Sequence, residues 1–105
     1  MYLNITENIK PNLSDVKLHQ NYPNPFNPNT LLNYNLPDDC LVNFTIYDMT
    51  GRIVKTLVNA SQTAGFKSVE WNATNDGNES VSAGLYLYTI KAGEFSKTKK
   101  MILLR

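Results

Sequence analysis

Apolar and polar residues alternate with a period of two along much of the chain after residue 30. In the segment 42–47, Val42, Phe44 and Ile46 share one parity, and the segment 31–36 repeats the pattern with asparagines in between. This alternation is typical of strands with one buried and one solvated face. We therefore predict strands at 31–36, 42–47, 52–58, 66–71, 84–90 and 95–104, with a further short strand at 16–18.

Turn-forming residues separate the predicted strands at intervals of about a dozen residues, and no helical period occurs. This spacing predicts an all-β fold, an Ig-like antiparallel β-sandwich of about seven strands. Gly51, Gly65 and Gly84 stand at strand boundaries, where we interpret them as backbone devices for turns and bulges. Tyr86 follows Gly84 as in a tyrosine corner, and Trp71 is expected in the core because Val69 shares its face.

The segment 20–30 breaks the strand pattern with Pro23, Pro25 and Pro28. Each proline fixes one dihedral, removes a backbone donor and makes the preceding residue extended. We expect a stiff, extended lead-in to the sandwich here. The predicted organisation is a flexible linker over residues 1–19 and a sandwich domain over 20–105, placed at the end of a larger protein.

Composition limits the classes of function. The 105 residues are 42% hydrophobic and carry a net charge of +1, so we expect a single domain without a nucleic-acid footprint. No apolar run is long enough to span a bilayer. Cys40 is the single cysteine, which excludes an internal disulfide. A secretory signal is expected upstream, because residues 1–4 do not start one.

Candidate catalytic and metal-binding residues are sparse. His19 is the single histidine, and the adjacent Asp38 and Asp39 point in opposite directions in an extended chain. The loop 72–79 has oxygen-bearing side chains at alternate positions, as in half of a calcium loop. Only Asp76 is charged before its glycine, and Ala83 stands where the bidentate glutamate belongs. We expect no enzyme, no cofactor and no metal site.

Several motifs occur in a fixed order along the chain. They are Gln20-Asn21-Tyr22-Pro23-Asn24-Pro25-Phe26-Asn27-Pro28, Tyr34-x-Leu36-Pro37, Ile46-Tyr47-Asp48, Gly51-Arg52-x-Val54, Ala64-Gly65, Val69-x-Trp71, Ser82-x-Gly84-Leu85-Tyr86-x-Tyr88 and Lys99-Lys100-Met101. Together they resemble one family, the C-terminal sorting domain of the type IX secretion system, which is similar in turn to the Ig-like domain of the flagellar hook-capping protein. Asn72-Ala73 and Phe66-Lys67 depart from the usual residues of that family.

The resemblance implies a non-catalytic signal that directs an upstream cargo in the same polypeptide through the periplasm to the surface of a Bacteroidetes-like bacterium. The implied partners are the outer-membrane translocon and a sortase-like surface peptidase that removes the domain. We expect cleavage within residues 1–19. Two alternatives stay open: a permanent structural Ig-like module, as a hook cap or spacer, and a carbohydrate-binding module that uses Tyr22, Tyr47 and Tyr88 as stacking platforms.

The last predicted strand ends with four consecutive apolar residues, where a half-buried strand should alternate. Either both faces are buried, or one face is kept for a partner. The functional hypothesis is that the translocon recognises this edge, partly by β-strand addition. Lys97 and Lys99 have a second reading, as charges that discourage edge-to-edge aggregation. The candidate recognition residues are Lys99, Lys100, Met101, Ile102, Leu103, Leu104 and Arg105.

Overall fold

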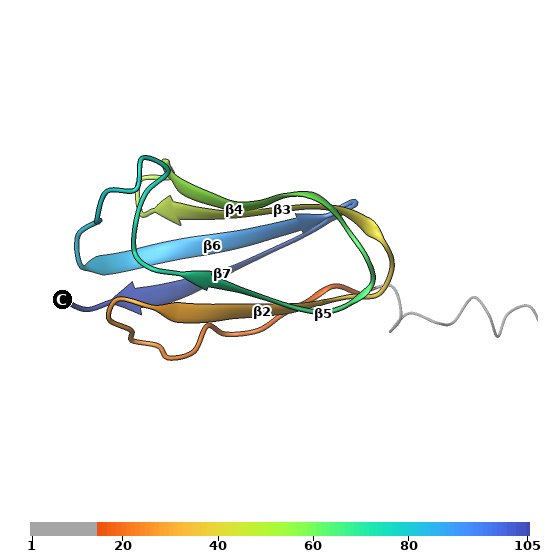
Figure 1. The fold of residues 1–105 in the computed structure, drawn as a ribbon, viewed down its shortest axis with the longest axis horizontal. Coiled ribbons are helices and arrows are strands. Elements are labelled where there is room, and N and C mark those ends of the chain that lie inside the picture. The colour runs from red at the N-terminus through yellow and green to blue at the C-terminus, as the bar shows by residue number, and fades with distance from the viewer. Residues whose placement is uncertain (1–14) are drawn as a thin grey trace, which may run out of the picture.

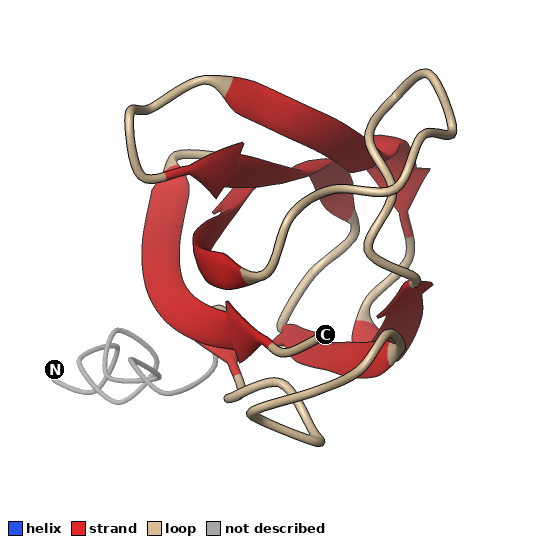
Figure 2. Cartoon of the chain, turned by 90° about the vertical axis from the view of Figure 1, so that its left-hand side faces the viewer, coloured by secondary structure: helices blue, strands red, loops and turns tan. Residues whose placement is uncertain are grey.

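The computed structural model describes residues 15–105, which form two antiparallel sheets packed face to face (Figure 1). The smaller sheet has the order β1-β2-β5, and the larger has the order β4-β3-β6-β7. No helix occurs in residues 15–105 (Figure 2). The predicted all-β, Ig-like sandwich of seven strands is thereby confirmed. The strands are β1 (Lys17–Leu18), β2 (Thr30–Leu36), β3 (Cys40–Asp48), β4 (Ile53–Gln62), β5 (Gly65–Trp71), β6 (Gly84–Ala92) and β7 (Phe95–Leu103).

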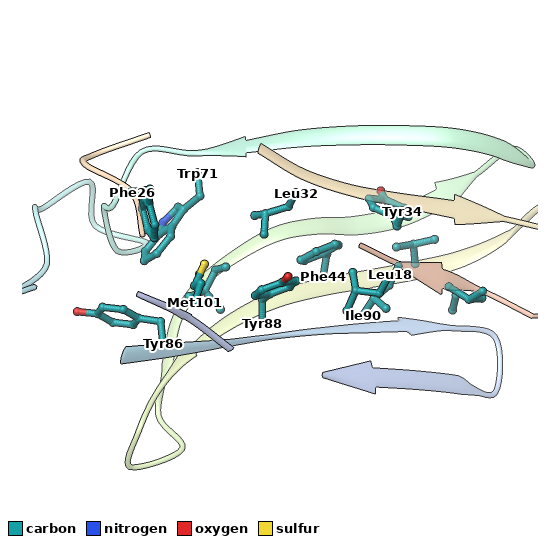
Figure 3. Packing of buried hydrophobic residues seen from close by; sticks show 14 of the residues in the cluster. Leu18, Phe26, Leu32, Tyr34, Phe44, Trp71, Tyr86, Tyr88, Ile90 and Met101 are labelled. Atoms are coloured by element: carbon teal, nitrogen blue, oxygen red, sulfur yellow. The ribbon is translucent and has the colours of Figure 1, made fainter. Parts of the chain in front are cut away.

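The core lies between the sheets and follows the alternation read from the sequence. The alternating apolar positions Leu32, Tyr34 and Leu36 of β2 and Val42, Phe44 and Ile46 of β3 point inward and are buried, whereas Leu31 and Leu41 are exposed. Aromatic side chains connect the two layers (Figure 3): the Phe44 ring lies 5.2 Å from Tyr34 and stacks on Tyr88 at 6.0 Å between centroids. Trp71 is buried as predicted, and its indole N–H donates to the carbonyl of Thr74 at 2.8 Å.

The fourth strand is longer than the sequence pattern predicts. The predicted strand 52–58 left residues 59–65 as a polar loop before the next predicted strand, but Asn59 to Gln62 continue β4 and pair with residues 40–43 of β3. The polar-loop prediction was wrong because this stretch is an outer strand whose side chains are mostly solvent-exposed. Alternation requires a covered face, and backbone pairing alone extends the strand here.

The fold begins before the predicted domain start at residue 20. Val16 and Leu18 are buried in the core, and β1 pairs with the end of β2 through Leu18 and Tyr34. The short strand expected at 16–18 is therefore present as Lys17–Leu18. The remainder of the predicted linker, residues 1–14, lies outside the described residues.

Turn geometry explains the glycines at the strand boundaries. Gly51 has φ +91° and closes the β3–β4 turn by donating to the carbonyl of Asp48 at 3.0 Å. Gly84 opens β6 with φ +147°, a backbone conformation that side chains with a Cβ seldom adopt. Just after it, the Tyr86 hydroxyl donates to the carbonyl of Ser82 at 2.6 Å, the backbone contact expected of a tyrosine corner.

Candidate interaction site at the end of the last strand

The proline-rich segment is folded against the end of β7, so the expectation of an extended lead-in was wrong. Phe26 and Leu103 form a parallel bridge: Phe26 N–H donates to the carbonyl of Ile102 at 3.0 Å, and Leu104 N–H donates to the carbonyl of Phe26 at 2.8 Å. The ring of Phe26 packs 5.8 Å from Trp71 (Figure 3). Burial of this one aromatic fixes the segment, which proline chemistry alone cannot predict.

Two polar side chains of the same segment complete the attachment. The Asn24 side-chain oxygen accepts from Ile102 N–H at 3.0 Å, and the Gln20 side-chain amide donates to the carbonyl of Lys100 at 2.8 Å. These contacts occupy the outward-facing backbone groups between Lys100 and Leu104. Strand addition at this end of β7 would therefore first have to displace the proline-rich segment.

The side chains of β7 alternate despite the unbroken apolar run. Met101 and Leu103 are buried in the core, whereas Ile102 is 40% and Leu104 is 51% exposed. Lys100 is exposed and Lys99 is half-buried. The first of the two readings, burial of both faces, is therefore wrong: one face of the strand lies inside and the other is exposed in the described chain. The accessible features are side chains, not backbone.

Arg105 is fixed by the neighbouring loop. Its guanidinium donates to the carbonyl of Val81 from Nη2 at 2.7 Å and from Nε at 3.1 Å, and to the carbonyl of Ala73 at 3.4 Å. The amide of Val81 in turn donates to the carbonyl of Ala73 at 3.0 Å. The side chain of Arg105 is thus positioned beside Leu104, which remains exposed.

A buried hydroxyl anchors the start of the proline-rich segment. Tyr88 donates to the carbonyl of His19 and accepts from the amide of Asn21, both at 2.9 Å. The Asn21 side chain donates to the hydroxyl of Thr30 at 3.0 Å and to the carbonyl of Pro23 at 3.1 Å. Burial raises the pKa of Tyr88 to about 12, although the hydrogen bond from Asn21 acts in the opposite direction. Tyr88 therefore stays protonated at neutral pH and holds the backbone on both sides of Gln20, at the start of the segment.

The carbohydrate-platform alternative loses one of its three rings at the same residue. It requires several of Tyr22, Tyr47 and Tyr88 to be coplanar and exposed, but Tyr88 is completely buried, Tyr47 is half-buried and Tyr22 is 76% exposed. Sequence reasoning missed the role of Tyr88, although its shared parity with Tyr86 and Ile90 was a signal for the core.

The other candidate chemistry is used within the fold. In the loop 72–79, the Asn75 side-chain oxygen accepts from the amides of Gly77 and Glu79, and Asp76 accepts from Thr56 of β4. No cluster of three metal-ligating side chains occurs in residues 15–105. The His19 ring contacts the Asn35 side-chain oxygen at 2.6 Å. These oxygens and this imidazole therefore support the loop and the sheet surface.

The comparison with known proteins settles the family. Residues 29–95 match the model of the FlgD Ig-like domain. The chain belongs to this family. The segments that meet at the end of β7, residues 20–28 and 96–105, lie outside the matched range. The structure that these two segments form together is the candidate site.

Solved structures show the same fold. Latent, dimeric PorU from Porphyromonas gingivalis aligns with TM-score 0.67, 22% identity, 85% of this chain and 9% of PorU. PorZ, an essential bacterial surface component of the type IX secretion system of the same organism, aligns with a TM-score of 0.58 and 21% identity over 84% of this chain and 11% of PorZ. FlgD of Xanthomonas campestris, which acts in flagellar hook capping, aligns with a TM-score of 0.58 and 22% identity over 83% of this chain and 64% of FlgD.

The FlgD-family chain thus spans about a tenth of PorU and PorZ and about two thirds of FlgD. No curated protein matches it by sequence. Residues 15–105 contain no helix that could cross a membrane.

Proposed function

We propose that this domain is a sorting signal that directs an attached cargo through a type IX secretion system to the cell surface. The observation that carries the proposal is the pairing of Phe26 with Leu103. It joins two segments that are far apart in the sequence, the proline-rich run and the lysine-rich last strand, into one structure at one end of the sandwich. Two distant motifs that build one surface are expected of a recognition element.

The fold supports this reading by analogy only, because one sandwich can serve many functions. The Ig-like sandwich recurs in PorZ, a surface component of a type IX secretion system, and in PorU. In the proposed role the domain catalyses nothing: it is recognised by protein partners during transit through the periplasm. The recognition residues are those predicted from the sequence, with Lys99, Lys100, Ile102, Leu104 and Arg105 accessible and Met101 and Leu103 serving the core.

Removal by a surface peptidase is part of the proposal. A peptidase needs extended, accessible backbone. Val16 and Leu18 are buried and β1 is paired, which contracts the expected cleavage zone from residues 1–19 to the part before Val16. Mass spectrometry of the mature surface protein would locate the cut, and a cut within β2 to β7 would contradict the proposal.

The structural alternative is a permanent Ig-like module, as in the hook-capping FlgD. The family match favours it as the second candidate. An intact domain on cargo that is attached to the cell surface would support this alternative over the removed signal.

Export of a reporter tests the proposal directly. Deletion of residues 100–105 would also remove Met101 and Leu103 from the core, so it confuses recognition with folding. A surface variant is sharper: Ile102→Ser with Leu104→Ser, in a reporter fused ahead of the whole chain in a bacterium with this secretion system. We expect the reporter to accumulate in the periplasm. The matched control is Phe66→Ser on the other sheet, which replaces a similarly accessible apolar side chain. The reporter fused to this variant should be exported normally. Normal export of the double variant would refute the assigned recognition residues.

A further inference from the structure

We propose that the outer face of the larger sheet, near the end of β7, is a docking surface for a protein partner that presents apolar side chains flanked by carboxylates. This inference rests on the proposed function, for which it defines the surface that meets the export receptor. We call the surface the outer patch. It consists of Tyr47, Ile53, Leu85, Leu87 and Ile102.

Strand register makes the outer patch continuous. Tyr47 of β3 stands opposite Ile53 of β4 and Leu87 of β6, and Leu85 stands opposite Ile102 of β7. Residues directly opposite in antiparallel strands point to the same face with their Cβ atoms about 5 Å apart. One apolar surface therefore crosses all four strands of the sheet.

Its contiguous apolar side chains distinguish this end of the face from the rest. Ile53 is 60% exposed and Ile102 is 40% exposed, while the three side chains between them are half-buried. The other end of the face is mainly polar, and its exposed Leu41 stands opposite Ser61. Isolated apolar side chains are ordinary on protein surfaces, but a contiguous apolar group is typical of an interaction site. The polar positions of this face include Asn43, Thr45, Asn59, Ser61, Thr89, Lys91, Ser96 and Thr98.

Charge identifies the partner. Lys100 stands opposite Leu87, at the margin of the outer patch. Residues 84–105 contain five of the ten basic residues of the chain and a single acidic residue, Glu94, whereas residues 15–83 contain seven acidic and four basic residues. Of these five basic residues, Lys100 is the one that stands opposite a residue of the outer patch, and its ammonium group beside an apolar centre complements a partner with a carboxylate next to an apolar contact.

Two other occupants fit less well. A symmetric dimer through this patch would place each basic hairpin against its own copy, because an isologous contact brings the same surface together. A lipid surface is usually bound by an amphipathic helix or a lipid anchor. The outer patch is instead carried by the strands of a sheet, and residues 15–105 contain no helix.

Export and crosslinking of the whole chain test the inference. The variant Ile53→Ser with Leu87→Ser leaves every recognition residue of β7 in place and touches none of the fully buried core residues. We expect about tenfold less reporter at the cell surface, with Leu41→Ser as the control that exports normally. Lys100→Glu should reduce export in the same way, and Lys17→Glu on the smaller sheet should not.

The partner is identified with a photo-crosslinking amino acid at position 87, or at position 41 as control, in exporting cells. An adduct with a protein of acidic surface from position 87 alone supports the inference. Adducts mainly with a second copy, or with lipid, would overturn it, as would normal export of the double variant. Failure of the wild-type chain to export any reporter would instead refute the proposed function, and the docking surface with it.

Discussion

Phe26 in the proline-rich segment pairs in parallel with Leu103 at the end of β7, 77 positions later in the chain. The sandwich is otherwise antiparallel throughout its named strands. This bridge closes the edge of the larger sheet where its last strand would be open to other chains. The proline-rich segment is therefore part of the folded domain and contributes to its stability.

Replacement of the buried aromatic should release that segment. Phe26→Ala removes a ring that packs on Trp71, and we expect the free energy of unfolding to fall by about 3–5 kcal/mol in urea titrations. Tyr22→Ala in the same segment removes a highly exposed ring and should change stability by less than about 0.5 kcal/mol. Equal effects from the two variants would show that the segment is not held as described.

Alkaline pH should weaken the domain through Tyr88. Its folded pKa of about 12 lies above the ordinary value of 10.0, so the unfolded chain loses this proton first. The associated stability is complete below pH 10 and disappears as the pH rises toward 12. Burial raises the pKa of Tyr34 and Tyr86 in the same direction.

Tyr88→Phe should therefore flatten part of the loss of stability between pH 10 and 12, measured by thermal melting across that range. At neutral pH the variant should cost about 1–3 kcal/mol, because the His19 carbonyl and the Asn21 amide lose their shared partner. An unchanged alkaline profile would contradict the role of this hydroxyl.

Gly84 should not tolerate a side chain. Nothing lies within 4 Å of a Cβ built there, so the cost of Gly84→Ala comes from its φ of +147° alone. We expect a loss of about 1–2 kcal/mol. Gly77→Ala is the matched control because its φ is not positive and its Cβ would meet only ordinary contacts. Equal denaturation midpoints for the two variants would argue against this explanation.

Calcium should leave the domain unchanged. The side-chain oxygens of Asn75 and Asp76 accept backbone amides within the fold, so the loop 72–79 offers too few free oxygens for a cation that takes six to eight. Calorimetric titration should give no binding heat, and the melting temperature should not move. A saturable heat that Asp76→Asn abolishes would disprove this expectation.

The sequence pattern predicts the parts of the fold in which burial and backbone pairing coincide. Alternation identified the inward side chains of β2 and β3, because each of those strands has one covered face. It failed at Asn59 to Gln62, where pairing continues without burial. Period alone cannot detect a stretch of strand whose side chains are mostly solvent-exposed.

The candidate site was only half predictable for a different reason. The run ending in Leu104 broke alternation, which left burial of both faces and one accessible face as open alternatives, and the structure shows an exposed face at Ile102 and Leu104. The proline-rich segment covers the outer backbone groups of β7 because Phe26 packs against Trp71. These two residues are 45 positions apart, so no local sequence pattern encodes their contact. The outer patch likewise needs the register of four strands.

The chain enters the described domain at the pole opposite Arg105, as β1 and the final residues lie at the two ends of the long axis (Figure 1). Any globular body joined ahead of Asp15 would therefore stand clear of Ile102 and its neighbours. In this arrangement, a receptor could bind the opposite end of the domain whatever the size or shape of the attached protein. One such domain would therefore suit many unrelated attached proteins.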